Sequence, residues 1–334
     1  MTFSNSAHRV STPAARAIAG NMIVWVSLLI PSAVLAQSDG DSDSRANIVV
    51  IVADDLGYGE TGMMGNAEIP TPNIDSLAAD GVRCTAGYVT ASYCSPSRAG
   101  MMTGRYQSRF GYDINPTGKR NLLANAGLPE SETTFVQQMA DAKYATGLVG
   151  KWHLGASPSK HPLERGFQEF YGFLHEGHFY VPGPPYENVL TMIRDNSLAA
   201  GERKRTGDVI RGNYARMSEP AYDADNPMLR GTEEIVENDY LTDAISDEAV
   251  EFINKHAADP FLLMVSYNAV HSPMQARNDD LERLRRIADD QRRIFAAMLV
   301  ALDRGVGRVR QAITENSLTR RTPVSYTHLT LPTS

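Results

Sequence analysis

Three short apolar runs constrain the fold of this chain more than any other feature. They are NIVVIVADDLGYG from position 47, ATGLVGKWHLG from position 145 and PFLLMVSYNAVHSP from position 260. Short apolar runs without polar alternation predict strands that are buried on both faces, as in a parallel sheet. Such a sheet needs helices on both of its faces to cover it.

Helical patterns separate these runs. In TPNIDSLAADG, Thr71 fits the N-cap, Pro72 the first turn and Gly81 the helix end. SETTFVQQMADAKY predicts another helix, with Ser131 as its N-cap. Two further helices are predicted over 239–256 and 289–313. The alternation predicts an α/β fold in which a mostly parallel central sheet is sandwiched by helices.

The chain is predicted to contain one main domain behind a targeting segment. Residues 1–36 have the pattern of a signal peptide, with two arginines, an apolar run and a small residue at the end. Residues 37–46 form a polar linker, and 47–318 form the main domain. Within it, the Gly-, Pro- and Tyr-rich stretch 155–234 is expected to form loops over one sheet edge. We expect export to a bacterial periplasm or the medium, without stable membrane insertion, because the apolar run is short for a span.

Composition argues against one class of function, and the two cysteines say little about whether a disulfide forms. A net charge of −7 argues against a general nucleic-acid binder, which would carry a basic patch. The two cysteines, Cys84 and Cys94, give only a weak disulfide signal. Cys84 has apolar neighbours and is expected to lie in the core.

Cys94 begins a stretch with unusual neighbours, CSPSRAGMMTGR. Pro96 fits the first turn of a helix, and Gly104 fits the residue just past its end. Cys94 is therefore expected at a helix N-terminus, with Arg98 one turn further on the same side. Both features favour a thiolate and predict a reactive cysteine. The alternative is that Cys94 is a small buried apolar residue, as most free cysteines are.

Polar residues follow each of the three predicted strands. They are Asp54, Asp55, Lys151, His153 and His271. In parallel α/β sheets ligands bind beyond the carboxyl ends of the strands, so these side chains are expected at one rim, joined by Cys94 and Arg98. Each has an ordinary alternative, because Asp-Asp before Gly is common turn chemistry and lone histidines are often structural. Their coincidence at one rim favours a site, and adjacent aspartates suit a hard divalent cation.

These motifs together resemble the type I sulfatases of the alkaline phosphatase superfamily. CSPSRAGMMTGR resembles the family signature, NIVVIVADDLGYG its opening strand, GKWHLG its lysine–histidine loop and NAVHSP its second histidine. The resemblance covers about 47 to 317, with the motifs in family order. It implies an enzyme that hydrolyses sulfate esters.

The resemblance also implies a role for each residue. A formylglycine-generating or radical maturase enzyme would oxidise Cys94 to formylglycine, whose hydrated aldehyde attacks sulfur and later expels sulfate. Asp54 and Asp55, with the modified Cys94, would bind a calcium ion, and Arg98 would hold the formylglycine. Lys151 would contact the sulfate oxygens. His153 would assist at the diol, and His271 would give a proton to the leaving group.

The C-terminal end departs from the family pattern. The family continues into a strand with an Asp-Asn pair and, later, a further lysine, whereas this sequence has no Asp or Asn after Asn316. Residues 319–334 resemble translated sequencing-adapter sequence. We therefore expect a truncated sulfatase domain that lacks the small C-terminal domain, two metal ligands and, in this form, activity. We expect an irregular, poorly packed tail that adds no strand to the sheet.

Three functions remain open at this stage. The first is sulfate ester hydrolysis, with a sulfated carbohydrate or an aryl sulfate as substrate. The second is phosphodiester or phosphonate hydrolysis, which the same superfamily performs. The third is binding without catalysis by an inactive fragment. Aromatic residues in HEGHFYVPGPPYENV are expected to shape the mouth of the pocket, since loops carry specificity.

Overall fold

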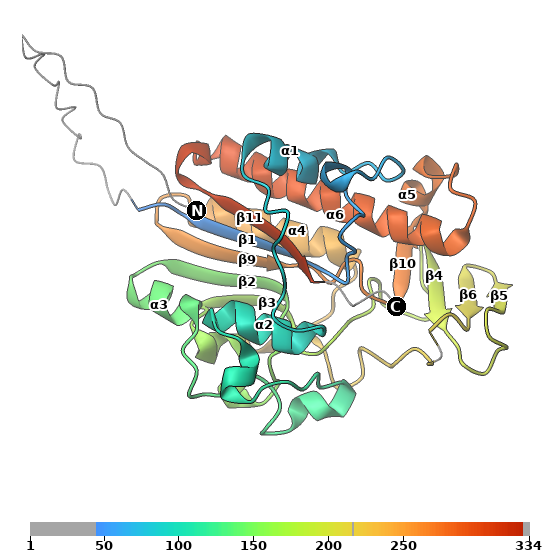
Figure 1. Ribbon diagram of the computed structural model, residues 1–334, viewed down its shortest axis with the longest axis horizontal. Coiled ribbons are helices and arrows are strands. Elements are labelled where there is room, and N and C mark those ends of the chain that lie inside the picture. The colour runs from blue at the N-terminus through green and yellow to red at the C-terminus, as the bar shows by residue number, and fades with distance from the viewer. Residues whose placement is uncertain (1–44, 216, 330–334) are drawn as a thin grey trace, which may run out of the picture. The chain divides into compact units, whose positions relative to one another are not determined.

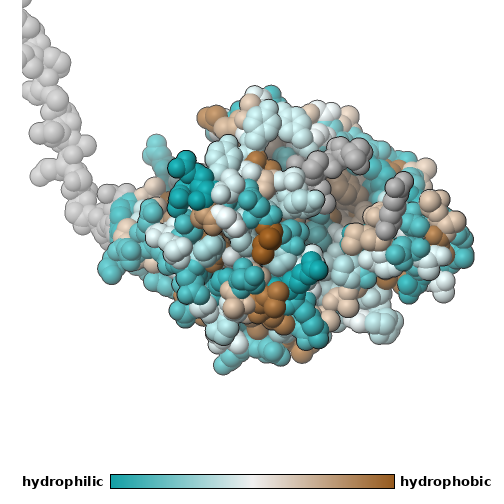
Figure 2. Space-filling view, turned by 60° about the horizontal axis from the view of Figure 1, so that its bottom comes forward, coloured by the Kyte–Doolittle hydropathy of each residue, from teal (hydrophilic) through white to brown (hydrophobic). Residues whose placement is uncertain are grey.

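The structure, a computed structural model, describes residues 45–215 and 217–329 (Figure 1). The predicted signal peptide and residues 37–44 of the predicted linker lie outside this part of the chain. Among the described residues, no helix combines the length and apolar character that crossing a bilayer requires. On the face drawn in Figure 2, hydrophilic residues predominate and apolar residues form small separate groups.

A mixed sheet of seven strands forms the centre of the domain. Its strand order is β11-β1-β9-β2-β3-β7-β8. The strands are β1 (Ile48–Asp54), β2 (Ala145–Lys151), β3 (Glu169–Phe173), β7 (Met228–Arg230), β8 (Glu233–Ile235), β9 (Phe261–Ser266) and β11 (Val324–Leu329). The first five in spatial order are parallel, and β7 and β8 are antiparallel additions at one edge. The predicted α/β fold with a mostly parallel sheet is confirmed.

Helices cover both faces of this sheet, as the apolar runs require. Figure 1 shows α1 (Pro72–Asp80) and α6 (Asp290–Glu315) on one side, and α2 (Cys94–Thr103) and α3 (Phe135–Asp141) on the other. Alternate residues of the strands serve the two faces. Ile51 and Val265 pack in the core with α4 (Leu241–Lys255) and α6, whereas Val52 and Met264 pack in the core with α2 and α3. The alternation follows from the opposite directions of successive side chains along a strand.

Three of the four strands of a second sheet lie where sequence analysis predicted only loops. Its order is β10-β4-β6-β5, from β4 (Val189–Arg194), β5 (Arg203–Thr206), β6 (Val209–Gly212) and β10 (Met274–Arg277). Strands β4, β5 and β6 of this sheet, together with β3, β7 and β8 of the main sheet, show that the expectation of loops over 155–234 is wrong. All of β5 is exposed, so its sequence carries no apolar pattern. Strand β4 pairs with the distant β10, a partner that local periodicity does not reveal.

The expectation of an irregular tail is wrong for residues 324–329. These residues form β11, which pairs in parallel with β1 from Val49↔Val324 to Asp54↔Leu329. The segment VSYTHL contains β-branched and aromatic residues, which favour strands, and β1 offers it a free edge. The strand lies at the edge of the sheet, and the described fold therefore extends past 318.

Two local predictions are wrong: the N-cap of α3 (Phe135–Asp141) and the burial of Cys84. The N-cap of α3 is Thr134, whose side chain accepts from Gln137 N while the Gln137 side chain accepts from Thr134 N. This reciprocal capping box outweighs Ser131, which lies three residues too early. Cys84 is exposed instead of lying in the core, and both cysteines are free. The predicted helix ends at Gly81 and Gly104 are confirmed.

The remaining connections contain short helical segments. Helix α5 spans Asn278–Arg283, and 3₁₀ turns occupy Gly62–Met64, Gln107–Phe110, Gly118–Leu122, Pro158–Lys160, Pro162–Arg165 and Thr319–Arg321.

Close backbone packing beside the site yields a first prediction. Gly150 in β2 has φ 106°, and a Cβ there would lie 2.0 Å from the Ser266 carbonyl oxygen in the neighbouring β9. We expect Gly150→Ala to lower the free energy of unfolding by about 3 kcal/mol, because it combines backbone strain with overpacking. Urea unfolding measures this change. Gly104→Ala is the control, since Gly104 also has positive φ but nothing within 4 Å, and should cost about 1 kcal/mol. Equal losses in the two variants would contradict the packing argument.

Candidate active site

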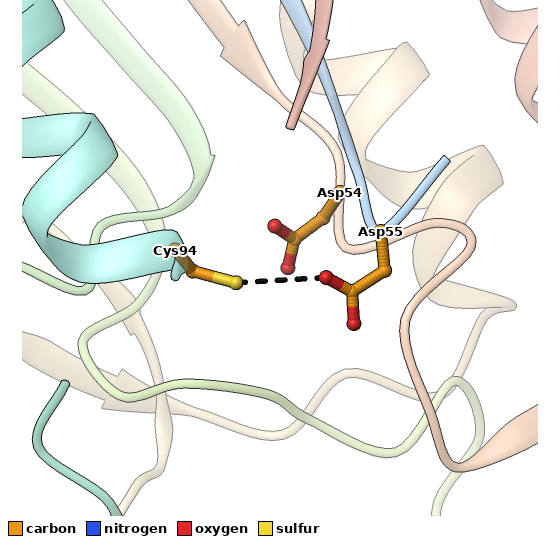
Figure 3. A group of neighbouring side chains, drawn as sticks. All are labelled: Asp54, Asp55 and Cys94. Carbon is orange, nitrogen blue, oxygen red and sulfur yellow. Dashed lines mark hydrogen bonds between the residues drawn. The ribbon is translucent and has the colours of Figure 1, made fainter. Parts of the chain in front are cut away.

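The predicted site residues gather at the carboxyl end of the main sheet. Asp54 is the last residue of β1 and Lys151 the last residue of β2. Cys94 is the first residue of α2, and Figure 3 shows its side chain directed toward both aspartates. His271 follows β9 by five residues and reaches the same place. The rim is thus built from three strands and one helix N-terminus.

Asp54 is the centre of a buried charge cluster. Its carboxylate accepts from Lys151 Nζ and lies 3.3 Å from Arg98 Nη2. Arg98 Nη1 also donates to Ser266 Oγ at 2.6 Å and to the Lys151 carbonyl at 3.1 Å. Burial raises the pKa of Asp54, but the charges of Lys151 and Arg98 outweigh it and hold that pKa well below its ordinary value. Asp54 is therefore a stable carboxylate between two buried cations.

Asp55 faces Cys94 and His271. Its carboxylate oxygens lie 3.6 Å from Cys94 Sγ and 3.6 Å from His271 Nε2. The backbone of Asp55 has φ 55°, in the left-handed region, which ends the strand alternation and lets consecutive carboxylates face one space. Burial raises the pKa of Asp55, and the nearby His271 opposes that rise.

The predicted thiolate is contradicted by these surroundings. Burial raises the pKa of the Cys94 thiol well above its ordinary value, and the charge of Asp54 raises it further. Lys151 and Arg98 oppose this rise but do not reverse it. The helix N-terminus and the arginine favour a thiolate, but burial of the sulfur beside Asp54 and Asp55, which the prediction of a thiolate did not weigh, outweighs them. An unmodified Cys94 is a protonated thiol.

The donor atoms partly suit a calcium ion. Carboxylate oxygens of Asp54 and Asp55 and the sulfur of Cys94 lie within 4.8 Å of one another. Carboxylates are the ligands that calcium prefers, and an oxygen in place of the sulfur would complete a hard donor set. Strand β11 places Leu329 opposite Asp54, and its six residues include no Asp or Asn. The described residues therefore offer fewer oxygen ligands than the family resemblance implies.

His153 is buried, and its ring bonds to backbone. Its Nε2 lies 2.9 Å from the Pro116 carbonyl, which only accepts, so Nε2 carries the proton. Its Nδ1 has no hydrogen-bond partner among the described residues and is therefore an unprotonated acceptor. Burial lowers the pKa of His153 well below its ordinary value, and the charge of Lys151 adds to this. The imidazole is therefore neutral, with Nδ1 as its unprotonated nitrogen.

Three supporting residues escaped sequence analysis. Ser95 Oγ donates to the His153 carbonyl at 2.7 Å and thereby joins α2 to the lysine–histidine loop. Asn115 Oδ1 accepts from Ser95 N at 3.0 Å, at the start of α2. Ser266 accepts from Arg98. Only Ser266 had a usable signal, because it ends a predicted strand beside the other rim residues.

A family comparison decides which proteins this chain is related to. The model of the family named Sulfatase matches residues 46–327. The chain belongs to the sulfatase family. This confirms the resemblance drawn from the four motifs and agrees with a site that combines carboxylates, cations and the signature cysteine.

Individual relatives support the same assignment. The chain is 34% identical to human arylsulfatase D over 85% of this chain and 53% of that protein. It is 32% identical to human steryl-sulfatase over 88% of this chain and 56% of that protein. A crystal structure of Ps i-CgsB superimposes with a TM-score of 0.71 and 35% identity, over 85% of this chain and 58% of the other. The sulfatase chain described here spans about half the length of the relatives it matches.

Proposed function

We propose that the protein hydrolyses sulfate esters of a carbohydrate. The observation that carries the proposal is the position of Cys94 at the N-terminus of α2, 3.6 Å from Asp55 and beside the buried Arg98–Asp54–Lys151 cluster. With a calcium ion on the two aspartates, the two fixed cations and the helix N-terminus would favour an anionic group at this place. The signature cysteine lies where a nucleophile would meet that group.

Two groups would complete the chemistry. Formylglycine derived from Cys94 would supply an oxygen nucleophile and a second hydroxyl through which sulfate can be released. A calcium ion held by Asp54, Asp55 and the modified residue 94 would supply positive charge against the sulfate oxygens. We further propose that the maturase acts on this chain's CSPSR motif.

The other roles in the reaction are assigned to residues of this chain. Lys151 and Arg98 hold positive charge fixed at the sulfate, so little reorganisation is needed as charge develops. His271 Nδ1 faces the Ser272 carbonyl, which only accepts, so Nδ1 carries a proton and donates it there. Nε2, 3.6 Å from Asp55, is the nitrogen left to deliver a proton, which it holds when the ring is an imidazolium. We assign to His271 Nε2 the protonation of the leaving alcohol. We assign the acceptance of the proton released at residue 94 to His153 Nδ1, which is unprotonated and has no hydrogen-bond partner among the described residues.

One solved relative supports a carbohydrate as the substrate class. A second structure of Ps i-CgsB, in complex with k-i-k-neocarrahexaose, superimposes with a TM-score of 0.68 and 34% identity. In this chain Phe179 and Tyr186 stack with ring centroids 5.4 Å apart, within the predicted pocket-mouth segment. Exposed parts of such rings suit the apolar faces of sugars. We also propose export of the protein, from the signal-peptide pattern of residues 1–36.

Parallel rate measurements test the reaction class. The protein, co-expressed with a formylglycine-generating enzyme and supplied with calcium, is assayed on an aryl sulfate and on the matching aryl phosphodiester. We expect a higher kcat/KM for the sulfate. A preference for the phosphodiester would favour the second function considered above. Absence of both activities, with formylglycine present at position 94, would favour binding without catalysis.

Calcium binding yields a second prediction. We expect millimolar calcium to raise the thermal unfolding midpoint, because two carboxylates with few further oxygen ligands give a weak site, with Kd on the order of 10⁻³ M. Scanning calorimetry with added calcium, against EDTA, measures the shift. Asp55→Asn should remove it. Asp225→Asn is the control, since Asp225 is an exposed carboxylate paired with Lys119. An equal calcium shift in the wild type and Asp55→Asn would contradict the assignment.

A further inference from the structure

His271 lies in the connection between the two sheets. Strand β9 ends at Ser266 in the main sheet, and β10 begins at Met274 in the second sheet. The backbone of this connection is fixed, because Ala269 O and Val270 N bond to Asp54 and the Tyr180 hydroxyl donates to the His271 carbonyl. These bonds place the Cα atom of His271 but leave the direction of its imidazole open.

The ring of Tyr222 packs against that imidazole. The two rings meet edge to face, with centroids 5.6 Å apart and an interplanar angle of 77°. The backbone of Gly177 lies against both rings, because a Cβ there would lie 2.9 Å from Tyr222 Cδ1 and 3.1 Å from His271 Cε1. The imidazole is therefore packed between a buried aromatic ring and a backbone segment that has no room for a side chain.

Buried polar groups hold Tyr222 itself. Its hydroxyl accepts from Arg194 Nη2 and shares a hydrogen bond of 3.2 Å with Ser272 Oγ. Arg194 ends β4 of the second sheet, and Glu219 binds it through the backbone N at 2.9 Å and through Nη2 at 2.7 Å. The side chains of Arg194 and Glu219 are 13% and 4% exposed. The second sheet thus anchors Tyr222 through a charge-balanced pair that solvent screens little.

We propose that Tyr222, anchored by Arg194 and Glu219, is a positioning residue that holds His271 Nε2 toward the leaving group. The proposal rests on the proposed sulfate ester hydrolysis for its catalytic consequence, but the packing itself does not depend on that function. The second sheet would then take part in the reaction. Its strand β4 supplies Arg194, which anchors Tyr222, and its strand β10 directly follows the connection that carries His271. A purely structural Tyr222 would instead affect folding without a specific effect on proton delivery.

Two substitutions distinguish the contribution of the Tyr222 ring from that of the hydrogen bonds of its hydroxyl. Tyr222→Phe keeps the ring but removes its bonds to Arg194 and Ser272, and Tyr222→Leu removes the aromatic contact as well. Tyr171→Phe is the matched control, because the Tyr171 hydroxyl is also bonded to a charged residue, Glu237, within the main sheet away from His271. Thermal unfolding confirms that each variant folds. Tyr222→Phe keeps the test valid if Tyr222→Leu does not fold.

The first measurement is independent of activity. Diethyl pyrocarbonate modifies accessible neutral imidazoles, and mass spectrometry follows the rate at His271 with His256 as an internal reference. We expect the His271 rate relative to His256 to rise severalfold in Tyr222→Leu, less in Tyr222→Phe and not at all in Tyr171→Phe. An unchanged ratio in both Tyr222 variants would overturn the positioning role, whether or not the protein is a sulfatase.

The second measurement tests the catalytic consequence. The ratio of kcat/KM between wild type and variant is determined on aryl sulfates with leaving groups of increasing pKa. A loss of His271 proton delivery should cost up to roughly 10²-fold for the poorest leaving groups and little for the best, in the same pattern as His271→Ala. Equal losses across the series would overturn the proposed role. Inactive wild-type protein would contradict the proposed function, while the modification rates would still decide the positioning.

Discussion

Replacing Cys94 with alanine should abolish sulfate ester hydrolysis, with a loss on the order of 10⁴-fold or more. The reason is that residue 94 would supply the nucleophile, and no other group at the rim offers one in its place. The Cys94 thiol is buried and its pKa is raised, so the unmodified side chain is a poor nucleophile in this setting. Cys94→Ser should be equally inactive unless the host converts serine.

Mass spectrometry checks the chemical basis of that result. Trypsin should release Cys84–Arg98 as one peptide, since no lysine or arginine lies between Arg83 and Arg98. After co-expression with the maturase, this peptide should carry an aldehyde at position 94 and a single alkylatable thiol, at the exposed Cys84. Cys84→Ala is the control and should keep both the aldehyde and the turnover. Full activity with a thiol at position 94 would refute the mechanism.

Replacing Asp54 with asparagine should lower the free energy of unfolding by about 3–5 kcal/mol. The substitution leaves Arg98 and Lys151, both buried, without the carboxylate that separates their charges. Urea unfolding in the presence of EDTA measures the change without a metal contribution. The matched control is Asp55→Asn at the next position. Burial raises the pKa of Asp55, so neutralising this side chain should leave stability unchanged or raise it.

The two aspartates should also differ in their dependence on pH. The folded pKa of Asp54 lies below its ordinary value of 3.8, so its stabilisation is present above pH 3.8 and is lost as the pH falls further. The folded pKa of Asp55 is raised, so its ionisation costs stability as the pH rises above 3.8. Asp54→Asn should therefore weaken the acid-induced loss of stability. Equal destabilisation by the two variants at neutral pH would contradict the charge cluster.

Much of the main domain followed from local sequence patterns. The strands β1, β2 and β9 were recognisable because each is a continuous apolar run that ends at a polar residue. Because parallel strands present their carboxyl ends at one rim, the order of the strands also predicts that Asp54, Lys151 and His271 lie together. Helix α2 was likewise placed by its own residues, with Gly104 in the left-handed conformation just past its end.

Tertiary structure decided the features that depend on partners distant in sequence. The second sheet needs the pairing of β4 with β10, and β11 needs the free edge of β1, so neither is visible in a short window of residues. The pKa of Cys94 also depends on residues that are distant in sequence. Sequence placed a helix N-terminus and Arg98 near Cys94 and therefore predicted a thiolate, but burial beside Asp54 raises the pKa instead.

The sequence by itself determined the family, the order of the site residues along the chain and the signature cysteine for which modification is proposed. Only the folded chain determined what those residues do to one another: Asp54 lies between two buried cations, His153 has an unprotonated Nδ1, and Tyr222 packs on His271. The physical reason is that strand and helix patterns arise from neighbours in sequence. Charge, protonation and side-chain orientation instead depend on burial and on distances that packing alone sets.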